Sequence, residues 1–303
     1  MFSRWNTAAA CAAALITTAL PLSGAPTTQA APPPCPDIYV VAVPGTWETS
    51  KSDPGQGMLA AVANDLPGDV HTDYVAYAAT AFPWEGDVYG RSKREALDNA
   101  RDLVTTMAQH CNTTRFALLG YSQGADAAGD LAAEIGTGLG AITPDRVTLV
   151  GLISDPRRSP TDNLIGPPVT GAGAGGPRLG GFGWLTPKTY TFCAVGDLYC
   201  ATPDGDYAAR IAGFLAQISN PDPTQFGTYQ QQAGNLIADA LAAGGLGLLH
   251  DQLNNSAYEQ RKQQIDDFLK SGIHQSYPHY TINPNGATPL TWLHQQLIDI
   301  AHN

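Results

Sequence analysis

The sequence predicts an α/β protein in which a central parallel sheet is flanked by helices on both faces. Short continuous apolar runs, such as residues 38–43, have the length and composition of strands buried on both faces. Between these runs lie amphipathic segments, and in residues 92–110 apolar side chains recur at steps of three and four. Strands that alternate with helices are typical of a parallel sheet with right-handed crossovers. We therefore expect functional groups beyond the carboxyl ends of the strands.

The remaining elements continue this alternation along the chain. The strand candidates are residues 38–43, 70–77, 115–121, 146–154 and 190–193, and the helix candidates are residues 58–66, 92–110 and 122–134. The glycine-rich stretch 171–183 is expected to be a flexible surface loop. Residues 207–271 favour helix, and we predict a helical insertion over about 205–271. Such an insertion is either a flap over a functional site or a helix pair packed on the outside of the core.

The first 30 residues have the layout of a secretory signal peptide. Arg4 precedes an apolar stretch over residues 8–20, and small and turn-forming residues follow as far as Ala30. The alternative, a membrane anchor, is disfavoured because the apolar stretch is too short to span a bilayer comfortably. We expect residues 1–30 to be removed and residues 31–303 to form one mature domain, either secreted or held in the cell envelope.

The charge balance disfavours nucleic acid as a partner. The chain carries 27 acidic and 16 basic residues, for a formal net charge of −11. A protein that follows a phosphate backbone needs a basic stripe, and none is visible along this sequence.

Four cysteines follow the predicted signal peptide: Cys35, Cys111, Cys193 and Cys200. An even number in an exported protein suggests two disulfides, and four cysteines allow three connectivities. The short spacing of Cys193 and Cys200 favours a local bridge, which leaves Cys35 to pair with Cys111. A zinc site is the competing interpretation, but this spacing is wider than that of structural zinc ligands, and we expect no metal.

The segment Gly120-Tyr-Ser-Gln-Gly124 matches the nucleophile-elbow pattern G-x-S-x-G and directly follows the apolar run 116–119. A serine hydroxyl is nearly inert at its free pKa, so it needs a base within reach and N–H groups that receive an oxyanion. A sharp turn from strand to helix provides both, which makes Ser122 the candidate nucleophile. The alternative is a glycine-rich turn with an ordinary helix-capping serine.

Several features together resemble the cutinase-like serine esterases, in particular the longer exported members of mycolic-acid-containing actinobacteria. They are a strand after Cys35, the segment 44–48 at its end, the elbow, Gly196-Asp197 between paired cysteines, and a late His-x-x-Tyr. The resemblance extends to the C-terminal helix and is interrupted by residues 207–271. It implies an α/β-hydrolase fold and a catalytic triad in the chain order Ser, Asp, His.

By this resemblance Asp197 is the acid of the triad, and there is also a physical case for it. A loop closed by a disulfide holds a carboxylate where it can accept a hydrogen bond from an imidazole. The rival is Asp155, which follows the strand at 146–154, although a hydrogen bond to nearby backbone would also explain it.

The resemblance makes His274 the base, because His274-Gln-Ser-Tyr277 matches the His-x-x-Tyr pattern. His279 is the alternative, since geometry and not spacing defines a triad. His250 lies within the insertion, and His294 is more simply a solvated helix residue. For the oxyanion hole we expect the N–H of Gln123, the residue after the nucleophile, and by resemblance Thr46.

The expected activity is hydrolysis of lipid or acyl esters through an acyl-enzyme on Ser122, with no cofactor and no protein partner. The long separation between Asp197 and His274 departs from small cutinases and leaves open whether the site is covered. A covered groove, with the apolar residues 246–249 as one wall, would suit long acyl chains. Two alternatives remain: an acyltransferase that uses the same acyl-enzyme, and a non-catalytic protein that binds envelope lipid.

Overall fold

The computed structural model describes residues 34–302 except 246, 248–250 and 253. The predicted signal peptide, residues 1–30, lies outside the described residues. From Cys35 onward the chain forms one compact unit.

The predicted parallel sheet is confirmed, with five strands in the order β2-β1-β3-β4-β5. All four strand pairs are parallel. The strands are β1 (Ile38–Val43), β2 (Val70–Tyr74), β3 (Arg115–Tyr121), β4 (Val147–Ile153) and β5 (Thr189–Phe192). The strand order reverses direction between β1 and β3, and ligands of open parallel sheets bind beyond the carboxyl ends at such a point. The segments that follow Val43 and Tyr121 therefore flank the expected site.

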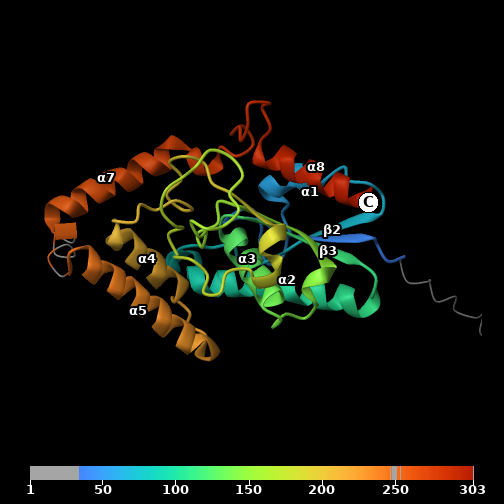
Figure 1. The fold of residues 1–303 in the computed structure, drawn as a ribbon, viewed down its shortest axis with the longest axis horizontal. Coiled ribbons are helices and arrows are strands. Elements are labelled where there is room, and N and C mark those ends of the chain that lie inside the picture. The colour runs from blue at the N-terminus through green and yellow to red at the C-terminus, as the bar shows by residue number, and fades with distance from the viewer. Residues whose placement is uncertain (1–33, 246, 248–250, 253, 303) are drawn as a thin grey trace, which may run out of the picture. The chain divides into compact units, whose positions relative to one another are not determined.

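Alternate side chains of each central strand enter different cores, because successive residues of a strand point to opposite faces. On one face Tyr39 and Val41 pack with α2 (Tyr89–His110) and α3 (Gln123–Gly136). On the other face Ile38 and Val40 pack with α1 (Ala60–Ala63) and α8 (Pro289–Ala301). Figure 1 shows α1 and α8 together on one side of the strands and α2 on the other.

The predicted helix at residues 58–66 is shorter in the structure. A 3₁₀ turn, η1 (Gly57–Leu59), leads into the single helical turn of α1, which ends at Ala63. Asn64 is extended and Asp65 has a φ of 58°, so the backbone leaves the helical region at this point.

The predicted insertion contains the helices α4 (Tyr207–Gln217), α5 (Phe226–Ala243) and α7 (Asn255–Ser271). Asp206 and Asn254 cap the starts of α4 and α7, with side-chain oxygens that accept from N–H groups three residues later. The insertion is anchored to α3 where α4 ends, since Gln217 Nε2 lies 2.5 Å from Asp126 Oδ2. The proposed groove wall at residues 246–249 lies largely outside the described residues.

The glycine-rich stretch is mainly turns and irregular backbone, with one antiparallel bridge from Ala172 to Thr202, and it is not simply a surface loop. Arg178 from this stretch is only 8% exposed. Its guanidinium forms an ion pair with Asp155. The expectation of a flexible surface loop is therefore wrong at this residue, because a buried ion pair fixes the loop against the body.

The four cysteines among the described residues form two disulfides, Cys35–Cys111 and Cys193–Cys200. The first joins the start of β1 to the end of α2 across a sequence separation of 76 residues. In the chain-entropy account, closing a loop of this length stabilises the fold by roughly 4 kcal/mol. The second closes a short loop at the carboxyl edge of the sheet, and this loop contains Asp197.

Candidate active site

Ser122 occupies a sharp turn between β3 and α3, with φ 56° and ψ −122°. This region is unfavourable for a residue with a side chain, and it is tolerated where the surroundings enforce it. The flanking glycines are required by close packing. A Cβ on Gly120 would lie 2.5 Å from Ala125 Cα, and one on Gly124 would lie 2.0 Å from Val43 O. The glycines of the motif therefore let α3 approach the strands closely enough to present Ser122 at the sheet edge.

The structure brings Ser122, His274 and Asp197 together in one hydrogen-bonded series. Ser122 Oγ lies 2.9 Å from His274 Nε2. On the other side of the ring, His274 Nδ1 lies 3.1 and 3.2 Å from the two carboxylate oxygens of Asp197. His274 sits in the 3₁₀ turn η6 (Ile273–Gln275), directly after α7. The Tyr121 hydroxyl holds this turn by donating to the carbonyl of His274 at 2.7 Å.

Asp197 is fully buried in the loop closed by the Cys193–Cys200 disulfide. Its Oδ2 accepts hydrogen bonds from the hydroxyls of Ser154 and Tyr277, both at 2.6 Å. Its Oδ1 accepts from the backbone N–H of Tyr199 at 3.1 Å. The carboxylate is therefore held in one orientation by donors from three different parts of the chain.

These donors determine the charge state of Asp197. Burial by itself raises the pKa of the carboxyl group, because the charged form loses its hydration. The hydrogen bond and charge of His274, with the hydroxyls of Ser154 and Tyr277, outweigh burial, so the pKa of Asp197 is lowered from its ordinary value. Asp197 is thus ionised at neutral pH and acts as an acceptor for the imidazole.

The rival acid, Asp155, has a different environment. Its Oδ2 lies 2.5 Å from a guanidinium nitrogen of Arg178, and its Oδ1 accepts from the N–H of Arg157 at 2.9 Å. Burial raises the pKa of Asp155, partly offset by the charge of Arg178. The side chain of its neighbour Ser154 reaches Asp197, whereas the carboxylate of Asp155 is directed to the buried arginine.

The other candidate bases lie elsewhere. The His279 side chain is exposed, four residues beyond the turn that carries His274. On α8, His294 Nδ1 lies 2.9 Å from the carbonyl of Val62 and so packs against α1. His250 lies outside the described residues.

Gln123 begins α3, and the first N–H groups of a helix have no intrahelical partner, so its N–H can serve an oxyanion. The side chain is fully buried and fixed at both ends. Its Oε1 accepts from the Ser92 hydroxyl at 3.1 Å, and its Nε2 donates to the Thr80 carbonyl at 3.0 Å. These contacts fix the position of the residue beside Ser122.

Thr46 lies half-buried in the turn after β1, across the switch point from Gln123. Glu48, which the sequence argument included in the segment 44–48 without giving it a role, shapes this turn. Its carboxylate accepts from the N–H of Gly45 at 2.8 Å and from the N–H of Met58 at 2.9 Å. Burial raises the pKa of Glu48, and these two N–H groups partly offset that effect.

The sequence argument also missed two contacts to Asp197. Tyr277 belongs to the His-x-x-Tyr pattern, so a signal for it was present, and its hydroxyl also accepts from the N–H of Ala194 at 3.0 Å. Ser154 had only its position, as the last residue of the strand predicted at 146–154, whereas the observed strand β4 ends one residue earlier, at Ile153. No local pattern distinguishes a serine there from an ordinary loop residue.

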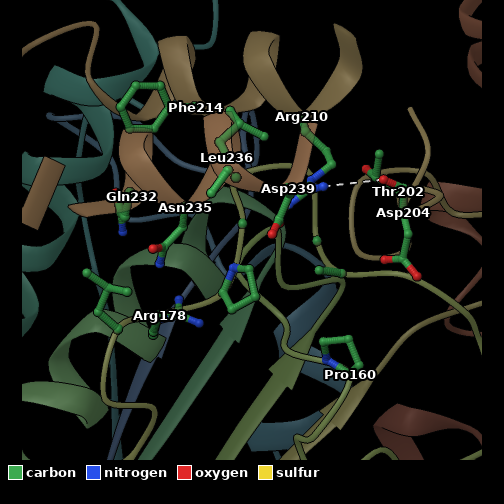
Figure 2. A pocket seen from close by; sticks show the side chains of 17 residues that line it. Pro160, Arg178, Thr202, Asp204, Arg210, Phe214, Gln232, Asn235, Leu236 and Asp239 are labelled. Carbon is green, nitrogen blue, oxygen red and sulfur yellow. Dashed lines mark hydrogen bonds and ion pairs between the residues drawn. The ribbon is translucent and has the colours of Figure 1, made fainter. Parts of the chain in front are cut away.

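A buried charge network lies behind the site, on the α2 and α3 side of the sheet. It combines carboxylates and cations in equal number: Asp126, Asp130 and Asp155 with Lys93, Arg157 and Arg178. Arg178 also borders a cavity of about 400 Å³ between the glycine-rich loop and the helices α4 and α5 (Figure 2). The ion pair of Arg210 and Asp239 closes part of its wall, and the lining does not include Ser122, Asp197 or His274. Within the described ranges, no cluster of three or more His, Cys, Asp or Glu side chains could hold a metal ion.

A parallel sheet with a serine elbow, and a histidine and an aspartate at its carboxyl edge, defines the α/β-hydrolases as a class. The profile of the Cutinase family matches residues 34–217, which include Ser122 and Asp197. The chain belongs to the cutinase family, a family of carboxylic ester hydrolases.

Curated relatives include proteins of Corynebacterium glutamicum and Mycobacterium tuberculosis. The chain is 31% identical over 223 residues to the carboxylesterase Culp6 homolog of Corynebacterium glutamicum, covering 59% of this chain and 72% of that protein. It is 28% identical over 209 residues to the phospholipase Culp4 of Mycobacterium tuberculosis, and this match covers 64% of this chain and 80% of that protein. Among solved structures, it is similar to the catalytic core domain of acetyl xylan esterase from Trichoderma reesei, with a TM-score of 0.47 and 20% sequence identity. This match covers 68% of this chain and 100% of that domain.

No helix in the described part of the chain has the length and apolar character to cross a membrane.

Proposed function

We propose that this chain is an exported serine esterase that hydrolyses lipid or acyl esters, with Ser122 as nucleophile, His274 as base and Asp197 as acid. The observation that carries the proposal is the series of hydrogen bonds from Ser122 Oγ through the His274 ring to Asp197, at 2.9 and 3.1 Å. An ionised carboxylate on Nδ1 leaves Nε2 as the acceptor for the serine proton.

In the first half of the reaction Ser122 Oγ attacks the ester carbonyl while His274 Nε2 takes the hydroxyl proton. The N–H of Gln123 and the N–H or hydroxyl of Thr46 bind the negative oxygen of the tetrahedral intermediate. Its collapse breaks the ester bond, and His274 gives the proton to the leaving alcohol. In the second half, water attacks the acyl-enzyme with His274 again as base, and the acid and free Ser122 result.

Apolar surface around the site supports a lipid substrate. The Phe268 ring on α7 lies 6.2 Å from the His274 ring, and Leu269 beside it is 67% exposed. On the other side, Trp47 follows Thr46 and is 66% exposed, with Phe82 6.4 Å from it. Each acyl CH₂ that such surface covers contributes about 0.8 kcal/mol. The curated relatives, one named a carboxylesterase and one a phospholipase, agree with ester substrates of this class.

We further propose that residues 1–30 are a signal peptide, that residues 31–303 form the mature domain, and that the protein works outside the cytoplasm or in the envelope. Two disulfides support this, because such bridges persist in oxidising compartments. Any association with envelope lipid would rest on apolar contact, since an acidic chain is not attracted to anionic lipid.

The test is release of p-nitrophenol from a series of short to long acyl esters by the mature protein. Ser122→Ala and His274→Ala should abolish the release, whereas His279→Ala should keep it. If His279→Ala abolished p-nitrophenol release and His274→Ala did not, His279 would be the base in place of His274. If the wild type is no faster than Ser122→Ala on every ester, the hydrolase proposal fails and a lipid-binding role becomes the better account.

An acyltransferase would share the acyl-enzyme, and added alcohol acceptors distinguish it. Under transfer, acyl product appears on the acceptor in place of free acid. Under hydrolysis, free acid remains the main product.

A further inference from the structure

Ser154 is a buried serine with an unusual backbone, directly after β4. It is fully buried and has a φ of 53°, in the left-handed region that favours glycine. Such a conformation is unfavourable for a residue with a side chain, so contacts with the rest of the fold must hold it. Its N–H donates to the carbonyl of Phe192 at 2.8 Å, which ties the residue to the end of β5.

The strained backbone places the Ser154 hydroxyl between the acid and the base of the proposed triad. Ser154 Oγ lies 2.6 Å from Asp197 Oδ2 and 3.1 Å from His274 Nδ1. An ionised carboxylate can only accept, so the hydroxyl proton of Ser154 points to Asp197. The lone pairs of Oγ then face Nδ1, and this contact is favourable only if Nδ1 carries the ring proton.

This directionality sets the tautomer of the imidazole. With the proton on Nδ1, the neutral ring has its free lone pair on Nε2, which is 2.9 Å from Ser122 Oγ. Asp197 alone specifies the tautomer less firmly, because its oxygens lie 3.1 and 3.2 Å from Nδ1 and Oδ2 already accepts two hydroxyl protons. Ser154 Oγ supplies a further acceptor for Nδ1–H at a similar distance.

We propose that Ser154 is a positioning residue, which fixes the Nδ1–H tautomer of His274 and shares that proton with Asp197 when the imidazolium forms. The role in catalysis rests on the proposed esterase function. No bond to Ser154 is made or broken: its hydroxyl proton stays on Oγ throughout, and the proton from Ser122 resides on His274 Nε2 until it reaches the leaving alcohol.

Two substitutions separate the hydroxyl from the backbone strain. Ser154→Ala removes the hydroxyl and keeps a Cβ at positive φ, whereas Ser154→Gly removes the hydroxyl and relieves the strain. Thr189→Val is the control, because it removes a buried hydroxyl on β5 that donates only to the Leu185 carbonyl at 2.9 Å.

We expect both Ser154 variants to lower kcat about tenfold with KM unchanged, as for the loss of a hydrogen bond within a charged pair. Ser154→Gly should unfold at a higher temperature than Ser154→Ala, although the two lose the same activity. In proton NMR, the downfield resonance of His274 Nδ1–H should shift or broaden in both variants and stay unchanged in Thr189→Val.

A decrease in kcat confined to Ser154→Ala would assign the effect to strain and overturn the proposal. So would wild-type kcat in both variants, or an unchanged Nδ1–H resonance. The resonance reports on Ser154 even if the wild type hydrolyses no ester. Inactivity of the wild type would refute the proposed function. An active wild type whose kcat is unchanged in both Ser154 variants would refute this inference alone.

Discussion

Replacing Tyr277 by phenylalanine removes one oxygen atom from the support of Asp197. Tyr277 is fully buried, and its hydroxyl donates to Asp197 Oδ2 at 2.6 Å while it accepts from the N–H of Ala194 at 3.0 Å. Burial raises the pKa of Tyr277 well above its ordinary value, so the hydroxyl keeps its proton across the whole assay range.

The magnitude follows from the two bonds that are lost. A hydrogen bond to a charged acceptor is worth about 2 kcal/mol, and a buried N–H left without an acceptor costs about 1 kcal/mol more. Tyr277→Phe should therefore lower the free energy of unfolding by about 3 kcal/mol at pH 7. For a chain of this size the melting temperature should fall by roughly 5 °C.

The loss should also depend on pH. Because the folded-state pKa of Asp197 is lowered, its ionised form contributes stability that is present above the unfolded pKa of about 3.9 and is lost as pH falls through the folded pKa. Tyr277→Phe removes a hydrogen bond that lowers the folded-state pKa of Asp197, so this pKa rises and ionised Asp197 contributes less to the stability. The difference from wild type should be largest near neutral pH and should shrink below about pH 4.

Urea unfolding of both proteins, from pH 7 down to acid, measures this difference. Tyr280→Phe is the matched control, because its hydroxyl accepts from the N–H of Val195 at 3.2 Å at an exposed position and does not contact Asp197. We expect the control to lose less than about 1 kcal/mol at every pH. If Tyr277→Phe loses no more than Tyr280→Phe, or if its loss is the same at all pH values, the reasoning is refuted.

Two further comparisons test the site. Asp197→Asn should lower kcat by about 10⁴-fold, because the amide favours the wrong imidazole tautomer. Asp155→Asn should instead lower the free energy of unfolding by about 3–5 kcal/mol, because it removes one carboxylate that pairs with the buried Arg178. The kcat of the folded Asp155→Asn protein should stay near wild type. Gly124→Ala should destabilise the fold by about 3 kcal/mol and lower kcat, because its Cβ would lie 2.0 Å from Val43 O.

Steady-state kinetics and urea unfolding, run on the same preparations, check these predictions. If kcat falls equally in the two asparagine variants, the assignment of the acid is wrong. Gly68→Ala is the control for the elbow, since a Cβ there would meet no atom within 4 Å. A Gly124→Ala protein as stable and active as Gly68→Ala would contradict the close-packing argument.

The sequence was sufficient for features that local patterns determine. Continuous apolar runs predicted strands buried on both faces, and the elbow predicted a turn whose glycines are required by the backbone contacts around them. The spacing of Cys193 and Cys200 predicted their pairing, because a short loop between cysteines closes easily.

Features that depend on contacts between distant segments were not predictable. The composition of the glycine-rich stretch predicts a loop exposed to solvent. Arg178 within it is nevertheless buried, because acidic side chains from α3 and from the loop after β4 form ion pairs with its guanidinium. The role of Ser154 depends on a loop more than 40 residues later, as its 43-residue separation from Asp197 shows. No periodicity or spacing reports such a contact.

The contact between His274 and Asp197 closes a loop of 77 residues that contains all the insertion helices. The entropy of closing a loop grows only with the logarithm of its length, so a loop half as long would be favoured by just about 0.6 kcal/mol. The contact between His274 and Asp197 thus tolerates large changes in the length of the chain between them. The length of the segment from α4 to α7 can therefore change at little cost in loop-closure entropy, while His274 and Asp197 keep the same contact.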